Sequence, residues 1–189
     1  MDQATFHDAL VRLFGPERVG CQVPLARFTT MRVGGPADWL VEPATSAEIV
    51  AALRIAHDAA VPVTLLGGGS NVIVGDRGVR GLVLRPRGGA IAEAEGGRVR
   101  ADAGATINSL VRFTISRALG GLEAWAGTPG TVGGAIYGNA HYAGRLIGGL
   151  VVSVALADQD GTVRDVPAGD LEFGYDTSRL QGTREVVLA

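Results

Sequence analysis

Two glycine-rich runs hold the residues of this chain that are best suited to bind a cofactor. The first reads Leu66-Gly67-Gly68-Gly69-Ser70-Asn71, and the second reads Gly127-Thr128-Pro129-Gly130-Thr131-Val132-Gly133-Gly134-Ala135. Glycine leaves the backbone bare, so successive N–H groups can approach a phosphate or a flat cofactor closely. Because the runs are far apart in the sequence, we expect two pieces of the fold to contribute to one ligand site.

The first run follows a predicted strand at 63–66. A tight turn there presents its amides as an anion nest, and Ser70 and Asn71 add side-chain donors suited to a diphosphate. The run is no P-loop, because no lysine follows the glycines. It is no Rossmann loop either, because Val72 stands where a third glycine is needed. A turn that is merely tight is the structural alternative.

The second run combines a fixed φ at Pro129 with several positions that lack a Cβ. These bare positions are Gly127, Gly130, Gly133 and Gly134. Thr131 is a candidate N-cap for a short helix through Ile136, whose free amides would point at a ligand phosphate. Polar residues follow, among them Asn139 and His141. The alternative is a helix start that is only tightly packed.

A third segment, 29–36, offers two hydroxyls, the cation Arg32 and the bare Gly34 and Gly35 before a predicted strand. His7 and His57 lie on predicted amphipathic helices and are expected at the surface, whereas His141 follows the second run and could reach its ligand. The spacing predicts neither a metal site nor a catalytic triad.

Alternating helices and strands must position these loops. Helices are predicted at 2–13, from 46 to about 60 with a Thr45/Glu48 capping box, and from 106 to the Gly120-Gly121 stop. The last has an apolar stripe of Ile107, Leu110, Val111, Ile115 and Ala118. Strands are predicted at 37–42, 63–66, 72–74, 81–84 and 185–188, with hairpins at 90–102 and 151–166, one helical turn at 167–171, and no periodic element between 14 and 30. The order of strand, helix, strand, glycine loop and strand up to residue 84 predicts a small α/β unit. For the chain as a whole we expect an α+β fold.

Composition narrows the function classes. The chain has 189 residues, a net charge of −2 and 29 glycines, and its basic residues never form a run, so nucleic acid and anionic membrane are not predicted as partners. The single cysteine, Cys21, cannot form an internal disulfide. No apolar stretch is long enough for a membrane span, and the N-terminus lacks a secretory signal. We therefore expect a soluble cytoplasmic protein.

Taken in order, three motifs resemble one family closely. They are Thr30-x-Arg32-Val-Gly-Gly-Pro36, Gly67-Gly-Gly-Ser-Asn71, and Gly127-x-Pro-Gly-x-Val-Gly-Gly-Ala135 with Asn139. The family is UDP-N-acetylenolpyruvoylglucosamine reductase, also called UDP-N-acetylmuramate dehydrogenase, a flavoenzyme of peptidoglycan synthesis. The resemblance covers about 29–180, nearly the whole chain.

The resemblance implies a two-lobed FAD-binding domain of the vanillyl-alcohol-oxidase-like (PCMH-type) fold. It implies a lead-in at 1–28, a first lobe at 29–88 and a second lobe at 89–189. FAD would be the cofactor, NADPH the co-substrate and a UDP-sugar enolpyruvyl ether the substrate. The implied FAD-binding residues are Arg32, Gly34, Gly35, Gly67, Gly68, Gly69, Ser70, Asn71, Gly127, Thr128, Pro129, Gly130, Thr131, Gly133, Gly134, Ala135 and Asn139.

The sequence departs from the family pattern in its catalytic residues. The family has an arginine directly after a tyrosine to stabilise an enolate, whereas this chain reads Gly174-Tyr175-Asp176-Thr177-Ser178-Arg179. Tyr175 and Arg179 are therefore our candidate catalytic residues, with Arg179 expected to replace the missing cation. The family's proton-donating serine and assisting glutamate belong to a C-terminal substrate-binding domain, so we expect a truncated portion that turns over poorly. The alternatives are a stand-alone flavin- or nucleotide-binding module and another oxidase of the same flavin fold.

Overall fold

The computed structural model describes residues 2–189, which form two compact units. The first, called unit 1, extends to Arg87 and also includes Gln159–Thr162. The second, called unit 2, comprises Gly88–Asp158 and Val163–Ala189. Unit 1 thus contains the first glycine run and unit 2 contains the second.

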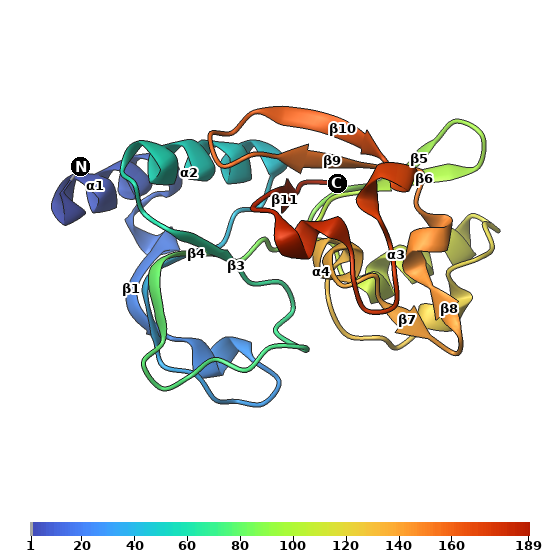
Figure 1. The fold of residues 1–189 in the computed structure, drawn as a ribbon, viewed down its shortest axis with the longest axis horizontal. Coiled ribbons are helices and arrows are strands. Elements are labelled where there is room, and N and C mark those ends of the chain that lie inside the picture. Colours follow the sequence, from blue (N-terminus) through green and yellow to red (C-terminus); the bar gives the residue numbers. More distant parts are fainter. Residues whose placement is uncertain (1) are drawn as a thin grey trace. The chain divides into compact units, whose positions relative to one another are not determined.

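Unit 1 is a small mixed sheet with two helices (Figure 1). Its helices are α1 (Gln3–Phe14) and α2 (Ser46–Asp58), and its strands are β1 (Val19–Pro24), β2 (Pro36–Val41), β3 (Val63–Leu65) and β4 (Val79–Leu84). The strand order is β1-β2-β4-β3, in which β1 and β2 are antiparallel and the other pairs are parallel. The parallel register sets Leu65 of β3 beside the buried Leu84 of β4, so the first glycine run leaves the sheet from a paired strand end.

Apolar packing fixes the sheet and helices of unit 1. Leu25, Leu40, Leu66 and Val83 belong to one buried cluster beside the loops of the first run. Phe6 of α1 lies edge to face on Trp39 of β2, with ring centroids 5.0 Å apart. Helix α1 therefore packs on the sheet through an aromatic pair.

The predicted cap of α2 is present, with one change of partner. The Thr45 hydroxyl accepts from the Glu48 amide at 3.1 Å. The Glu48 carboxylate accepts from the Ala44 amide at 2.7 Å, one residue earlier than in a standard capping box. The same carboxylate receives two 2.8 Å hydrogen bonds from Arg18, which ties α2 to the start of β1.

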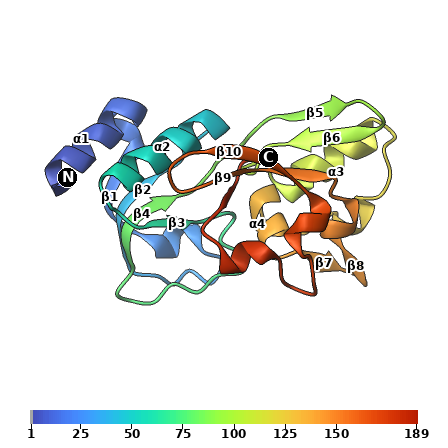
Figure 2. The same cartoon turned by 45° about the horizontal axis from the view of Figure 1, so that its top comes forward.

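Unit 2 contains two hairpins, a three-stranded sheet and two helices (Figures 1 and 2). Its helices are α3 (Ile107–Ser116) and α4 (Val132–Tyr137), and its strands are β5 (Ile91–Ala94), β6 (Arg98–Ala101), β7 (His141–Tyr142), β8 (Arg145–Leu146), β9 (Ser153–Ala157), β10 (Val163–Pro167) and β11 (Val186–Val187). The sheet order is β10-β9-β11, all antiparallel. Its core joins Ile107 of α3, Ile136 of α4, Leu156 of β9 and Leu171. Both predicted hairpins and the helical turn before Leu171 are confirmed.

Three predictions about the elements are wrong. Residues 19–24 form β1 rather than an irregular segment, and 72–74 form no strand. Helix α3 ends at Ser116, before the Gly120-Gly121 stop, because Ala118 adopts a left-handed φ of +54°. Ile115, which was expected in the buried stripe, is consequently exposed, and Thr114 is buried there instead. Among the described residues, no helix is long and apolar enough to cross a membrane.

Candidate functional site

In unit 1 the first glycine run packs against the 29–36 segment through its backbone. The Thr30 amide donates to the Gly69 carbonyl at 2.9 Å. Gly69 has a φ of +69°, and a Cβ added there would lie 1.9 Å from the Phe28 carbonyl oxygen. Only glycine fits this close approach, so the sequence fixes the shape of the run at its third glycine.

The amides of Gly67 through Asn71 have no hydrogen-bond partner anywhere in residues 2–189. The side chains of Ser70 and Asn71 are likewise without partners there, and both residues are exposed. Backbone N–H groups are obligatory donors, so a row of five unused ones is an unfilled set that suits phosphate oxygens. The structure therefore gives unit 1 a donor-rich, anion-compatible loop.

The 29–36 segment adds one positive charge and structural glycines. Arg32 is exposed, and its guanidinium makes no ion pair or hydrogen bond with the described residues. Gly34 accepts from the Ala26 amide at 3.1 Å, and Gly35 donates to the Gly75 carbonyl at 3.1 Å. An added Cβ at Gly35 would lie 2.0 Å from the Asp76 carbonyl oxygen. The two glycines thus shape the loop, and Arg32 is its available cation.

The second run, in unit 2, corrects an expectation. Thr131 does cap α4, since its hydroxyl accepts from the Gly134 amide at 3.4 Å. The first amides of α4 are not free, however. Val132 donates to the Ala105 carbonyl and Gly133 to the Ala103 carbonyl, each at 2.9 Å.

The amides just before α4 are also largely used. Gly127 donates to the Asn108 side chain at 2.7 Å, and Thr128 donates to the Trp125 carbonyl at 2.9 Å. Within the described residues, Gly130 and Thr131 alone keep unused amides in 127–135. This run therefore offers an exposed, tightly packed surface at Pro129 and Gly134 for a flat group, while Ala135 is buried in the core.

Asn139 is an internal brace. Its side chain is fully buried at 0% exposure, donates to the Gly174 carbonyl at 2.6 Å and accepts from the Gly148 amide at 2.8 Å. The side chain of Asn139 is therefore not available to a cofactor, contrary to the direct binding role predicted for it.

The two candidate catalytic residues have different surroundings. The Arg179 guanidinium donates to Glu185 at 2.9 Å, and the Glu185 side chain is only 6% exposed. Arg164 pairs with the same carboxylate. Arg179 is thus engaged in an ion pair with a buried carboxylate, and its expected role as the replacement cation stays a prediction. Tyr175 is exposed and its hydroxyl lies 3.1 Å from His141 Nε2.

Sequence reasoning missed the partnership between His141 and Asp176. Nδ1 of His141 lies 2.7 Å from a carboxylate oxygen of Asp176. The Asn139 side chain, two residues before His141, holds the Gly174 carbonyl of the turn that contains Tyr175 and Asp176. No spacing rule links positions 141 and 176, because the contact depends on the tertiary fold.

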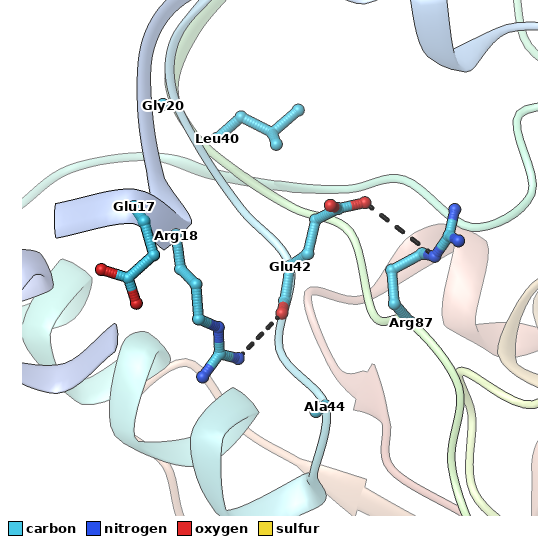
Figure 3. A pocket seen from close by; sticks show the side chains of 7 residues that line it. All are labelled: Glu17, Arg18, Gly20, Leu40, Glu42, Ala44 and Arg87. Carbon is cyan, nitrogen blue, oxygen red and sulfur yellow. Dashed lines mark hydrogen bonds and ion pairs between the residues drawn. The ribbon is translucent and has the colours of Figure 1, made fainter. Parts of the chain in front are cut away.

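A hollow elsewhere on unit 1 is lined by none of the predicted site residues (Figure 3). Its lining consists of Glu17, Arg18, Gly20, Leu40, Glu42, Ala44 and Arg87. Arg18 donates to the Glu42 backbone carbonyl at 3.0 Å, and Arg87 lies 4.0 Å from the Glu42 carboxylate. The charge of Arg18 is paired with Glu48, and the Glu42 carboxylate also pairs with Arg85.

Comparisons with known proteins agree with a flavin-binding class. The model of the FAD binding domain family matches residues 37–167. The structure of 4-ethylphenol oxidase from Gulosibacter chungangensis resembles this chain in fold alone, with a TM-score of 0.60 and 16% sequence identity. The match covers 86% of this chain and 34% of the oxidase chain. The chain belongs to the FAD binding domain family and has the vanillyl-alcohol-oxidase-like α+β fold, for which FAD is the cofactor.

More specific relatives are the reductases that the motifs resemble. UDP-N-acetylenolpyruvoylglucosamine reductase 2 of Symbiobacterium thermophilum is 41% identical over 173 residues, which are 91% of this chain and 56% of that protein. The crystal structure of the reductase from Thermus caldophilus matches with a TM-score of 0.73 and 30% identity, covering 90% of this chain and 60% of its own. This chain is similar to the FAD-binding part of these reductases, and it spans a little over half of their length.

Proposed function

We propose that this chain is the FAD-binding part of an NADPH-using enzyme that reduces UDP-N-acetylglucosamine enolpyruvate to UDP-N-acetylmuramate. The observation that carries the proposal is the 41% identity to such a reductase over nine-tenths of the chain, against 16% for the oxidase of the same fold. The cytoplasmic location and the UDP-sugar substrate expected from the sequence belong to the same proposal.

The donors of unit 1 fit the proposed cofactor. A diphosphate carries two negative charges and only accepting oxygens, and the unused amides of Gly67 to Asn71 supply matching donors without displacing any internal hydrogen bond. Arg32 adds a charge that nothing in the described chain neutralises. We assign these residues, with the shaping Gly34 and Gly35, to FAD in unit 1.

Unit 2 contributes surface and support in this proposal. Thr128, Pro129, Gly130 and Gly134 would contact the cofactor, while Thr131, Gly133, Ala135 and Asn139 hold that surface in place. When bound, FAD supplies the hydride chemistry, so the protein's share is orientation and electrostatics.

A direct test is titration of the purified chain with FAD, followed by the quenching of flavin fluorescence. We expect saturable binding, and we expect Arg32→Ala to weaken it about tenfold through the loss of one charge-assisted contact. Arg12→Ala is the matched control, because Arg12 is an exposed arginine of the same unit on the outer face of α1. A chain that takes up no FAD contradicts the proposal.

The substrate is tested separately on a chain extended to the length of its relatives. We expect NADPH consumption that requires UDP-N-acetylglucosamine enolpyruvate. Equal NADPH consumption with and without this enolpyruvyl ether would reject the assigned reaction while leaving FAD binding intact.

A further inference from the structure

Tyr175, His141 and Asp176 of unit 2 are hydrogen-bonded in series. A carboxylate oxygen of Asp176 lies 2.7 Å from His141 Nδ1, and His141 Nε2 lies 3.1 Å from the Tyr175 hydroxyl. The imidazole and phenol rings also lie against each other, with centroids 4.6 Å apart. The sequence spacing predicts no catalytic triad, yet the fold brings together the three parts of one: a hydroxyl, a base and a group that orients the base.

The backbone around these three side chains is fixed by hydrogen bonds. The turn at 174–177 carries both the phenol and the carboxylate, and its end residues, Gly174 and Thr177, exchange amide hydrogen bonds of 3.0 and 3.3 Å. The buried Asn139 side chain, two residues before His141, donates to the Gly174 carbonyl at 2.6 Å. The segment that carries the imidazole is therefore tied to the turn that carries its two partners.

The partners of the imidazole determine where its proton lies. An ionised carboxylate only accepts hydrogen bonds, so the proton of the neutral ring is assigned to Nδ1, which faces Asp176. Nε2 then has a lone pair for its other partner, the Tyr175 hydroxyl. A base held in this tautomer can take the phenol proton while the phenol oxygen attacks an electrophile.

Tyr175 differs in this respect from the other two tyrosines of the chain. All three are exposed, Tyr137 at 49%, Tyr142 at 55% and Tyr175 at 71%, so their exposures differ by less than about a factor of two. The hydroxyls of Tyr137 and Tyr142 make no hydrogen bond within residues 2–189. The chain thus contains two reference phenols that are comparably accessible but lack a base.

We propose that Tyr175 is an activated nucleophile that accepts an acyl group from an activated acyl donor, a class of ligand whose carbonyl carbon carries a good leaving group. Because Tyr175 is 71% exposed, such a donor can approach it from solvent. The result is a covalent modification site on the turn at 174–177. This site goes beyond the proposed reductase activity and does not depend on it.

The transfer balances without a further reactant. The Tyr175 oxygen forms a bond to the carbonyl carbon of the donor while its O–H bond breaks and the proton passes to His141 Nε2. Asp176 stabilises the imidazolium that forms. The bond between the carbonyl carbon and the leaving group then breaks, and the leaving group takes the proton from Nε2. His141 returns to its neutral tautomer, and Tyr175 carries an aryl ester.

N-acetylimidazole, which acetylates tyrosine hydroxyls, tests the proposal on the chain as it is, without FAD or substrate. The reaction is run in mildly alkaline buffer, which favours a neutral imidazole. We expect Tyr175 to be acetylated at least about tenfold faster than Tyr137 and Tyr142, because a positioned general base typically contributes about 100-fold or more. Peptide mass spectrometry over a time course measures the three rates in one sample.

Substitution of the base separates activation from exposure. His141→Gln keeps hydrogen-bonding capacity but cannot take up the proton, so the Tyr175 rate should fall to that of Tyr142. His57→Gln is the matched control at an exposed histidine of unit 1, and it should leave the Tyr175 rate unchanged. Asp176→Asn, which suits the left-handed φ of +54° at this position, should lower the Tyr175 rate at least about threefold.

Unchanged Tyr137 and Tyr142 rates in the variants show that the fold persists. A Tyr175 rate that exceeds the Tyr142 rate by less than about tenfold in the native chain overturns the proposal. A fast Tyr175 rate that persists in His141→Gln overturns it too, as does an equal loss in His57→Gln. None of these samples contains FAD, so the failure of this proposal and the failure of FAD binding are recognised separately.

Discussion

At the scale of single residues, Gly69 and Gly134 show that glycines in similar motifs have different functions. The sequence treats them alike, yet a Cβ at Gly69 would meet the Phe28 carbonyl oxygen at 1.9 Å, whereas the nearest atom at Gly134 is 3.5 Å away. We expect Gly69→Ala to lower the free energy of unfolding by about 2 kcal/mol, because it adds left-handed strain to a backbone clash. Urea denaturation measures this loss, and FAD affinity should fall with it.

Two further glycines serve as controls for that substitution. Gly134→Ala should change the free energy of unfolding by less than about 0.5 kcal/mol, as expected where space is available. Gly88 has a φ of +72° and no atom within 4 Å of an added Cβ, so Gly88→Ala reports the strain alone. If Gly69→Ala proves no more destabilising than Gly88→Ala, the Phe28 contact does not constrain the loop.

Asn139 makes a second residue-scale prediction. Asn139→Ala removes a fully buried side-chain amide and leaves its two partners, the Gly174 carbonyl and the Gly148 amide, unsatisfied. We expect a loss of about 3 kcal/mol in the free energy of unfolding. Asn108→Ala, which removes one exposed bond to the Gly127 amide, should cost clearly less. Equal losses in the two variants would contradict the role of Asn139 as a brace.

At the scale of elements, the contact between Arg18 and Glu48 ties the start of β1 to α2. The side-chain hydrogen bonds from Arg18 are the main cause that lowers the pKa of Glu48, helped by the Ala44 amide and opposed by burial. A carboxyl whose pKa is lower in the folded protein stabilises the fold above its unfolded pKa, and this stability is lost as the pH falls through the folded value.

We therefore expect Glu48→Gln to lower the free energy of unfolding by about 1 kcal/mol at pH 7. The difference between Glu48→Gln and the native chain should shrink as the pH falls below about 4.5, where the native carboxyl also becomes protonated. Urea denaturation across this pH range measures both effects. Glu95→Gln, at an exposed hairpin position, is the control and should leave the pH profile unchanged. A gap that stays constant with pH would refute the ion-pair explanation.

The elements also show how far local sequence patterns reach. Caps and apolar spacing were sufficient to predict the presence of α1, α2, α3 and both long hairpins, because those signals act within one turn or one strand pair. Strand β1 was missed because Gly20 and Pro24 have low strand propensity; its pairing with β2 stabilises the strand instead. The prediction that the first amides of α4 are free to face a phosphate was wrong for a related reason. The carbonyls that accept from them, those of Ala103 and Ala105, lie some 30 residues earlier in the sequence.

The candidate site divides in the same way. The glycine runs could be found from sequence, since bare backbone is a property of residue type. The sequence could not show which amides of these runs stay free, because that depends on whether a carbonyl from a distant part of the chain accepts from them. Likewise, the role of Arg179 was decided by Glu185, and that of His141 by Asp176. The partner of Arg179 lies six residues later in the sequence and that of His141 lies 35 residues later, so no single spacing rule assigns these side chains.

At the scale of the whole molecule, the two units differ in how their glycine runs should respond to FAD. Amides 67–71 of unit 1 have no internal partner in the described chain, whereas Val132 and Gly133 of unit 2 are already bonded. Hydrogen exchange should therefore be fast at 67–71 without FAD and slow strongly with it, while exchange at 132–133 should be slow in both states. FAD at 100 times its Kd should also add about 2.7 kcal/mol to the free energy of unfolding.

Peptide-resolved hydrogen exchange with and without FAD measures the difference between residues 67–71 and 132–133. AMP, which lacks the diphosphate, is the control ligand and should protect residues 67–71 less than FAD does. Equal protection of 67–71 by AMP and FAD would remove the diphosphate from these five amides.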